Sequence, residues 1–151
     1  MDRLTEESTM VNEREIRRKL HIATGLVIGV TILWAFLFVP RLGAHPQAIK
    51  DGAANSAWMF YKMQLAAAIF LLASIILSRL GRLGGKICIG LLYVAAMLVF
   101  LHDFMVFNGA VFYLQTYEGF RTVAILMLVC VGANLVAGIL AIMAGNRLGR
   151  G

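Results

Sequence analysis

Four long apolar stretches, separated by short polar or glycine-containing segments, dominate this chain of 151 residues. They cover residues 21–40, 58–79, 87–107 and 122–144. An α-helix needs about 20 apolar residues to cross the roughly 30 Å hydrocarbon core of a bilayer. The pattern therefore predicts an all-α integral membrane protein with four transmembrane helices. Because the connections are short, we expect an up-down-up-down bundle of antiparallel neighbours.

Single residues set two of these boundaries. Pro40 is expected to end the first helix, because proline has no N–H to continue the hydrogen-bond ladder. The third helix is expected to break at Asn108-Gly109, because an unbroken helix to Leu114 would measure about 42 Å and exceed the membrane. Residues 110–120 would then form an aromatic-rich interfacial turn or short helix.

The remaining segments are short and polar. Residues 1–20 form a polar N-terminal segment whose first dozen residues are expected to lack fixed order, and residues 146–151 form a short basic tail. The transmembrane domain would occupy residues 21–145. A proline at the first position of a helix is favourable, so His45-Pro46 predicts a short surface helix over 46–51.

Composition narrows the functional class. The chain is 60% hydrophobic and 15% charged, with a mean hydropathy of +0.81, whereas globular domains average about 25% charged residues. Four spans leave no room for a soluble domain, and dinucleotide, P-loop and zinc-ribbon spacings are absent from the sequence. We therefore expect no enzymatic activity of the ordinary soluble kind and assign no catalytic residue.

The net charge of +6 is explained by the flanks of the spans, so nucleic acid is not an expected partner. One set of flanking segments is much richer in Lys and Arg than the other. Its members are Arg14, Arg17, Arg18, Lys19, Arg79, Arg82, Lys86, Arg147 and Arg150. Because positive charge in short loops stays cytoplasmic, we expect both termini in the cytoplasm, and a bacterial inner membrane as the location.

Three polar residues in or near the spans form the candidate functional cluster: Lys62, His102 and Asp103. Counting from the inner side places Asp103 about 24 Å across, near the outer surface, and Lys62 at a similar depth. A carboxylate inside a membrane usually faces the bundle and is paired, so Lys62 and Asp103 are expected within reach of each other. The alternatives are a purely structural ion pair or a lysine that snorkels to the interface.

Soft-metal ligation is a further hypothesis for the outer side. Imidazole and thioether ligands suit copper, although methionine also fills gaps in apolar cores. The residues concerned are His45, Met59, Met63, His102 and Met105. A haem with two histidine ligands is disfavoured, because His21 and His102 would lie about a bilayer apart.

Aromatic residues are concentrated in the outer half of the spans and in the outer loops. An interfacial belt explains Trp and Tyr but not so many Phe on one side. The asymmetry suggests either an outer hydrophobic cavity, suited to a lipid or quinone, or a face against a partner subunit.

Small residues mark positions where helices are expected to approach closely. Gly25 and Gly29 form a G-x-x-x-G pair in the first span, and Gly138 lies on the fourth span one turn after Asn134. Such residues favour close packing, and a mid-span asparagine favours an interhelical hydrogen bond. The lipid bilayer, other membrane subunits or further copies of this chain are the expected partners.

Part of the first span carries a family resemblance. Lys19-Leu20-His21, followed by Gly25, Gly29, Trp34 and Pro40-Arg41, resembles the first helix of copper-resistance-protein-D-like membrane proteins. Asn134-Leu135 and Gly138 are similar to the last helix of small four-span relatives. The resemblance implies a four-helix core and copper-related transport, but the helices here lack a clear metal-ligand pair.

Three functional hypotheses follow. The first is a small non-catalytic subunit that packs into and stabilises a larger inner-membrane complex, whether respiratory, photosynthetic or for transport. The second is a small transporter or metal-handling protein that uses His102, Asp103 and Lys62. The third is a haem- or quinone-binding membrane anchor.

Overall fold

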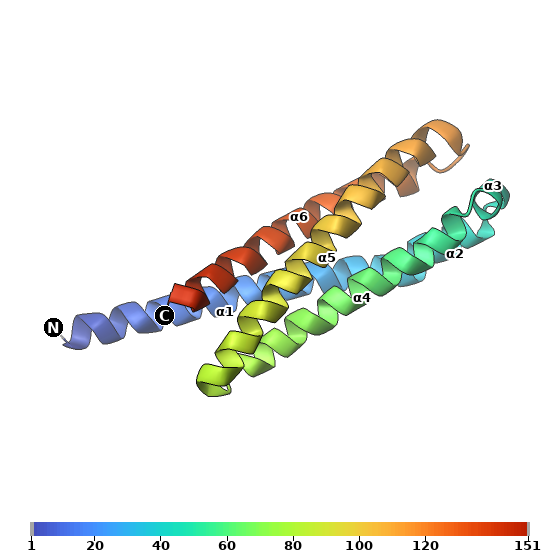
Figure 1. Ribbon diagram of the computed structural model, residues 1–151. Helices are drawn as coiled ribbons and strands as arrows, with labels where there is room; N and C mark the ends of the chain where they lie inside the picture. Colours follow the sequence, from blue (N-terminus) through green and yellow to red (C-terminus); the bar gives the residue numbers. More distant parts are fainter. Residues whose placement is uncertain (1, 151) are drawn as a thin grey trace.

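The structure, a computed structural model, describes residues 2–150 and, of these, the side chains of all but residues 81–84. No strand occurs in this range, and seven helical elements follow one another. They are α1 (Asp2–Leu33), the π-helix η1 (Trp34–Phe38), α2 (Val39–Ala44), α3 (Pro46–Lys50), α4 (Ala53–Leu77), α5 (Gly81–Thr116) and α6 (Arg121–Arg150). Both ends of the chain lie at one end of the elongated molecule, and α3 lies at the other (Figure 1).

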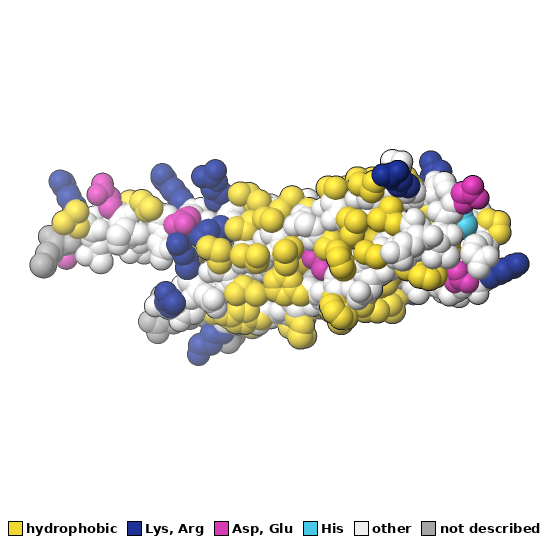
Figure 2. All heavy atoms as spheres, turned by 90° about the horizontal axis from the view of Figure 1, so that it is seen from above, with side chains coloured by type: hydrophobic (Ala, Val, Ile, Leu, Met, Phe, Trp, Pro, Cys, Tyr) yellow, Lys and Arg dark blue, Asp and Glu magenta, His cyan; other side chains and the backbone are white. Residues whose placement is uncertain are grey.

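The predicted helical membrane class agrees with this structure. Four continuous helical segments are long and apolar enough to cross a membrane: Asp2–Ala44, Ala53–Leu77, Gly85–Thr116 and Arg121–Arg150. On the face shown in Figure 2, hydrophobic side chains cover the middle of the bundle and Lys and Arg gather towards its two ends. This distribution is typical of a protein whose middle lies in hydrocarbon.

The first span does not end at Pro40, so that prediction is wrong. Before the proline the helix widens into η1, where the Val39 N–H donates to Trp34 O, and α2 then continues to Ala44. Pro40 lies in the first turn of α2, where a missing N–H removes no hydrogen bond. The π-turn therefore carries the helix past the proline, as wider turns do inside membrane helices.

The predicted break at Asn108-Gly109 is also wrong. Asn108 Nδ2 donates to Phe104 O at 2.9 Å, one helical turn back, so its amide is satisfied within α5. A side chain at Gly109 would meet only ordinary contacts with Tyr113, at 3.6 Å. The helix continues to Thr116 and the chain turns at Gly119, where φ is +74°. At about 54 Å for its 36 residues, α5 is longer than a bilayer core is thick.

The short surface helix predicted over 46–51 is confirmed as α3, Pro46–Lys50, whose first turn is capped by His45. The expectation that the first dozen residues lack order is wrong, because α1 begins at Asp2. Arg147 of α6 and Lys19 hydrogen-bond Glu15 on this helical stem and hold the pKa of its carboxyl below its usual value. The predicted basic residue Arg82 lies among the side chains that are not described.

Buried apolar side chains form two clusters along the bundle. The aromatic cluster lies towards α3 and consists of Val30, Trp34, Phe38, Val39, Leu42, Ala48, Ala53, Ala57, Phe60, Val106, Ala110, Tyr113, Tyr117, Phe120, Val123, Ala124, Met127 and Cys130. The alanine cluster lies towards the termini and consists of Ile16, Leu20, Ala23, Val27, Ala67, Ala68, Leu71, Cys88, Leu92, Ala95, Ala96, Val99, Ala137, Ala141 and Ala144. The candidate site lies between them.

Candidate functional site

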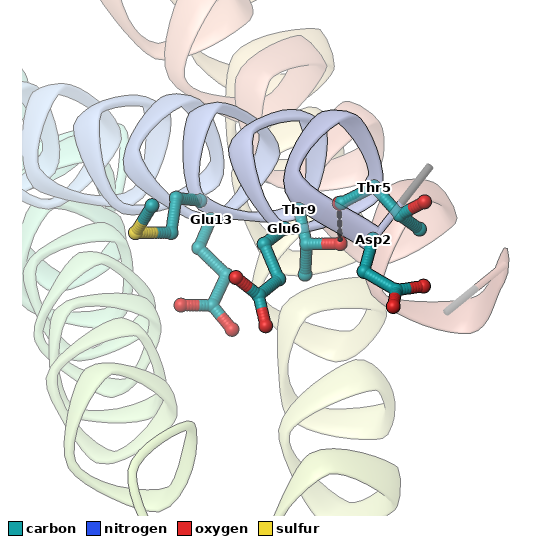
Figure 3. Close-up of a pocket in the computed structure, with 6 residues that line it drawn as sticks. Asp2, Thr5, Glu6, Thr9 and Glu13 are labelled. Carbon is teal, nitrogen blue, oxygen red and sulfur yellow. Dashed lines mark hydrogen bonds between the residues drawn. The ribbon is translucent and has the colours of Figure 1, made fainter.

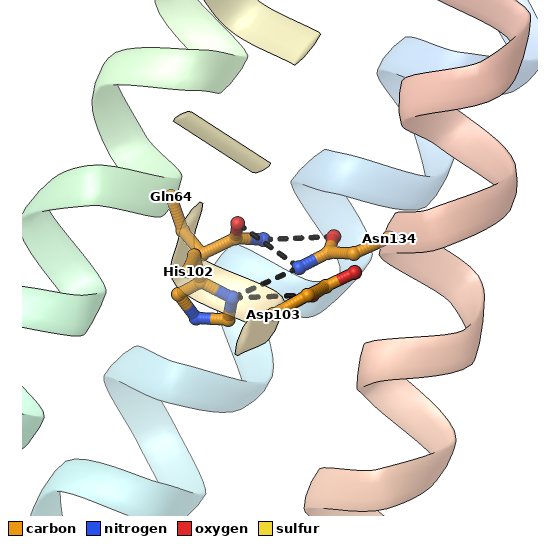
Figure 4. Close-up of polar contacts among 4 residues, drawn as sticks. All are labelled: Gln64, His102, Asp103 and Asn134. Carbon is orange, nitrogen blue, oxygen red and sulfur yellow. Dashed lines mark hydrogen bonds and ion pairs between the residues drawn. The ribbon is translucent and has the colours of Figure 1, made fainter. Parts of the chain in front are cut away.

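Four polar side chains meet in the interior of the bundle. Gln64 comes from α4, His102 and Asp103 from α5, and Asn134 from α6, and Figure 4 shows them converging between these helices. Gln64, His102 and Asn134 are fully buried, and Asp103 is 6% exposed. We call these four residues the polar layer.

The polar layer separates the two apolar clusters. Each of its three helices passes from the aromatic cluster, through one polar position on α4 and α6 and two adjacent ones on α5, to the alanine cluster. The flanking pairs are Phe60 and Ala67 on α4, Val106 and Val99 on α5, and Cys130 and Ala137 on α6. Helical spacing of three or four residues thus places the polar side chains at one level on the buried faces of all three helices.

Hydrogen bonds connect the polar layer across the three helices. Gln64 Nε2 donates to Asn134 Oδ1, and Asn134 Nδ2 donates to Gln64 Oε1, both at 3.1 Å. Asn134 Nδ2 also lies 3.2 Å from His102 Nδ1, and the same ring nitrogen lies 3.4 Å from Asp103 Oδ1 (Figure 4). Buried polar groups need such partners, because an unpaired one costs about 1–3 kcal/mol.

Aromatic rings enclose His102 on the side of the aromatic cluster. Trp34 and Phe60 approach the imidazole edge-on, with ring centroids 5.5 Å and 5.8 Å away. Trp34 also contacts Phe38 at 4.9 Å, and both are essentially buried. Since η1 begins at Trp34 and ends at Phe38, the π-turn before Pro40 presents these two rings to the site.

Three buried polar atoms at the site have no hydrogen-bond partner within the described part of the chain: Trp34 Nε1, His102 Nε2 and Asp103 Oδ2. All three belong to residues in or against the polar layer. Most buried polar groups in proteins are paired, so an unpaired group calls for a physical explanation. Their concentration at one level makes the polar layer the strongest functional candidate in the molecule.

The structure corrects the predicted role of Lys62. Lys62 is exposed, Asp103 is buried, and the described residues contain no ion pair between them. Residues two apart on a helix point about 200° away from each other, so Lys62 faces outward where Gln64 faces inward. The nearest ionisable partner of Asp103 is His102.

Gln64 was missed by the sequence analysis, which followed the charged neighbour instead. A signal was present: Gln64 shares helical spacing with Phe60, Ala67, Ala68 and Leu71, all of which are buried. An amide on an otherwise apolar helix face predicts an interhelical hydrogen bond. The same reasoning correctly selected Asn134.

The two histidines predicted as metal ligands, His45 and His102, lie in different surroundings. His45 stacks on Tyr117 at 4.8 Å, and its Nδ1 accepts from Ala48 N, whereas His102 lies in the polar layer. Met59 is exposed, and Met63 and Met105 pack against the aromatic cluster. Within the described residues no group of three His, Cys, Asp or Glu is arranged to hold a metal ion.

Cys88 and His21 lie apart from the polar layer, whereas Cys130 flanks it on α6. Cys88 and Cys130 are free and buried, and Cys88 Sγ lies 3.3 Å from Ser74 O. His21 is exposed and lines a shallow recess with Ser78 and Arg79, apart from the environment of His102.

The predicted packing glycines have different outcomes. A Cβ atom at Gly138 would come within 2.5 Å of Phe100 Cε1, so the Phe100 ring packs directly against this glycine. Gly25 and Gly29 are exposed and have nothing within 4 Å of the Cβ position. No other part of the described chain approaches them, and their packing against a partner helix stays a prediction.

A hollow also lies along the N-terminal stem (Figure 3). Its lining residues are Asp2, Thr5, Glu6, Thr9, Met10 and Glu13. All of them belong to one helix, α1, so the hollow has no second wall that would enclose a ligand. We assign no site to it.

Comparison with known proteins gives no assignment: no family model, curated protein or solved structure matches this chain.

Proposed function

We propose that this protein is a non-catalytic subunit of a larger inner-membrane complex, which it enters as a four-span bundle. Its helices would cross the membrane up, down, up and down, with both termini in the cytoplasm. The end of the bundle that carries the termini also carries Arg147 and Arg150, in the last turn of α6, and Arg17 and Arg18, which follow the Glu15 that Arg147 contacts. An excess of positive charge near the ends of spans favours the cytoplasmic side.

The observation that carries the proposal is the outward position of Lys62. Its backbone lies only about 3 Å along α4 from Gln64, which belongs to the buried polar layer. The Lys62 side chain is exposed, and no ion pair to it is recorded among the described residues. Charged side chains within spans rarely face lipid. The cost of about 2.5–3.5 kcal/mol applies to a lysine at the span centre and falls towards the span ends, where Lys62 is expected. A carboxylate on a neighbouring membrane subunit would neutralise it.

The surface around Lys62 suits a protein neighbour. Trp58 and Met59 on the same helix are 54% and 42% exposed. Aromatic residues and methionine are enriched at protein interfaces. The proposed partner is therefore a transmembrane helix that places an Asp or Glu opposite Lys62 among apolar side chains.

Purification in mild detergent tests this function. Tagged wild-type protein, extracted from native membranes, is expected to retain one or more membrane subunits. The Lys62→Glu variant should lose these subunits, and the Lys62→Ala variant should bind them more weakly. Lys50→Ala is the matched control, because Lys50 is exposed on α3 outside the spans. Retention of the same partners by all three variants, or migration of the wild type alone as a small homo-oligomer, would overturn the proposal.

A further inference from the structure

We propose that the polar layer is a proton-binding site, in which the proton held by His102 and Asp103 sets the orientation of the Gln64–Asn134 amide pair. This inference concerns the interior of the bundle and does not depend on the subunit role. The ligand is a single dissociable proton, and the site is assembled from α4, α5 and α6.

The crowding at His102 Nδ1 is the first observation. This nitrogen lies 3.2 Å from Asn134 Nδ2, which carries only donors, and 3.4 Å from Asp103 Oδ1. An unprotonated Nδ1 has one lone pair and accepts from Asn134, and Asp103 then has to carry a proton to avoid facing that lone pair as an anion. A protonated Nδ1 instead donates to the Asp103 carboxylate, and the Asn134 N–H has no acceptor there.

The reciprocal amide pair is the second observation. Gln64 and Asn134 exchange two hydrogen bonds, so one side chain cannot exchange its oxygen and nitrogen unless the other does the same. When Nδ1 is protonated, its single N–H points between Asp103 Oδ1 and Asn134. Asn134 can share that hydrogen only by presenting Oδ1, and Gln64 must then turn as well. Two internally consistent hydrogen-bond arrangements therefore exist, one for each protonation state of Nδ1.

His102 Nε2, which has no hydrogen-bond partner among the described residues, is the atom from which the proton leaves the site. In the loaded state Asp103 holds an O–H and His102 holds an Nε2–H. On release, the Asp103 O–H bond breaks and Nδ1–H forms, while Nε2–H breaks and its proton passes to a water molecule. The products are the Asp103 carboxylate, a neutral His102 protonated at Nδ1, and hydronium.

Few other groups bear on this site. Cys130 of α6 lies on the aromatic side of the layer, α4 contributes the uncharged Gln64 and Phe60, and η1 contributes Trp34. Lys62 faces away from it. Proton binding therefore depends mainly on Asp103, His102 and the two amides. Replacing Asp103 thus tests its contribution separately.

Nuclear magnetic resonance on nitrogen-labelled protein in lipid nanodiscs tests the inference. The chain contains three histidines, and His21 and His45 serve as internal controls. Between about pH 4 and about pH 9, we expect the proton of His102 to move from Nε2 to Nδ1 as the site releases its proton. The side-chain amide signals of Gln64 and Asn134 should shift with the same midpoint.

The Asp103→Asn variant provides the matched comparison, because asparagine keeps the size of the side chain but cannot release this proton. It should hold His102 in one tautomer and abolish the linked amide shifts. An unchanged wild-type tautomer throughout the range would overturn the proposal. A tautomer change that persists with the same midpoint in Asp103→Asn would overturn it as well.

Discussion

The two apolar clusters on either side of the polar layer are built from different side chains. The aromatic cluster buries Trp34, Phe38, Phe60, Tyr113, Tyr117 and Phe120. The alanine cluster buries no aromatic residue and contains eight alanines: Ala23, Ala67, Ala68, Ala95, Ala96, Ala137, Ala141 and Ala144. The same four spans are thus held together by large rings at one end and by small side chains at the other.

The two compositions predict that the clusters respond differently to substitution. Small residues let helix backbones approach closely, which matters in a membrane because lipid is as apolar as leucine. Large rings instead fill the space between helices, so their removal leaves cavities. The aromatic end should therefore be sensitive to truncation, and the alanine end to enlargement.

Truncation at the aromatic end should give the largest effect. Trp34→Ala removes a ring that is 1% exposed and touches Phe38, Phe60 and His102. We expect a loss of about 3–5 kcal/mol in the free energy of unfolding, measured by steric trapping in bicelles. Trp34→Phe should recover most of it, and a loss below about 1 kcal/mol for Trp34→Ala would contradict the cavity argument.

Enlargement at the alanine end should have an intermediate effect. Gly138→Ala places a Cβ atom 2.5 Å from Phe100 Cε1, so we expect a cost of about 1–3 kcal/mol in the same assay. Gly29→Ala is the matched control, because nothing lies within 4 Å of its Cβ position. Equal stabilities of the two variants would show that close packing at Gly138 does not matter.

Removing one hydrogen bond at the loop end of the aromatic cluster should lower stability by a smaller amount. The Tyr117 hydroxyl donates to Asp51 Oδ2 at 3.0 Å and connects the loop before α4 to the loop after α5. Tyr117→Phe removes this hydrogen bond and should cost about 1 kcal/mol. Thermal unfolding in detergent measures the loss, and an unchanged midpoint would show that the bond contributes nothing.

The same tyrosine predicts a pH dependence. Burial, followed by the hydrogen bond and the negative charge of Asp51, raises the pKa of Tyr117 to about 12. An unfolded tyrosine titrates near pH 10, so the neutral hydroxyl contributes stability in full below about pH 10 and loses it as the pH rises through about 12. Tyr117→Phe should lack this part of the alkaline loss, and identical alkaline profiles would contradict it.

The apolar runs predicted the helical membrane class well, because length and hydrophobicity decide whether a helix can span a bilayer. Helix ends were predicted less well. Pro40 and Asn108-Gly109 are ordinary helix terminators in isolation, but a π-turn and an Asn108 hydrogen bond to Phe104 keep the helices continuous. Such local compensation depends on neighbouring geometry that residue type alone does not reveal.

The site was predicted only in part. The small buried neighbours Ala95, Ala96 and Val99 correctly indicated that Asp103 faces the interior. The choice of Lys62 over Gln64 failed because charge was given more weight than helical phase. The pairing of amides across α4 and α6 depends on the relative register of two helices, which one sequence does not specify.

The double-mutant cycle between Gln64 and Asn134 tests most directly whether the polar layer joins the helices between the two clusters. Gln64→Leu, Asn134→Leu and the double variant keep the side-chain size while removing the reciprocal hydrogen bonds. We expect a coupling free energy of about 1 kcal/mol, within the range found for interhelical hydrogen bonds in membranes. Strictly additive effects would contradict the account, because they would mean that the two amides do not interact.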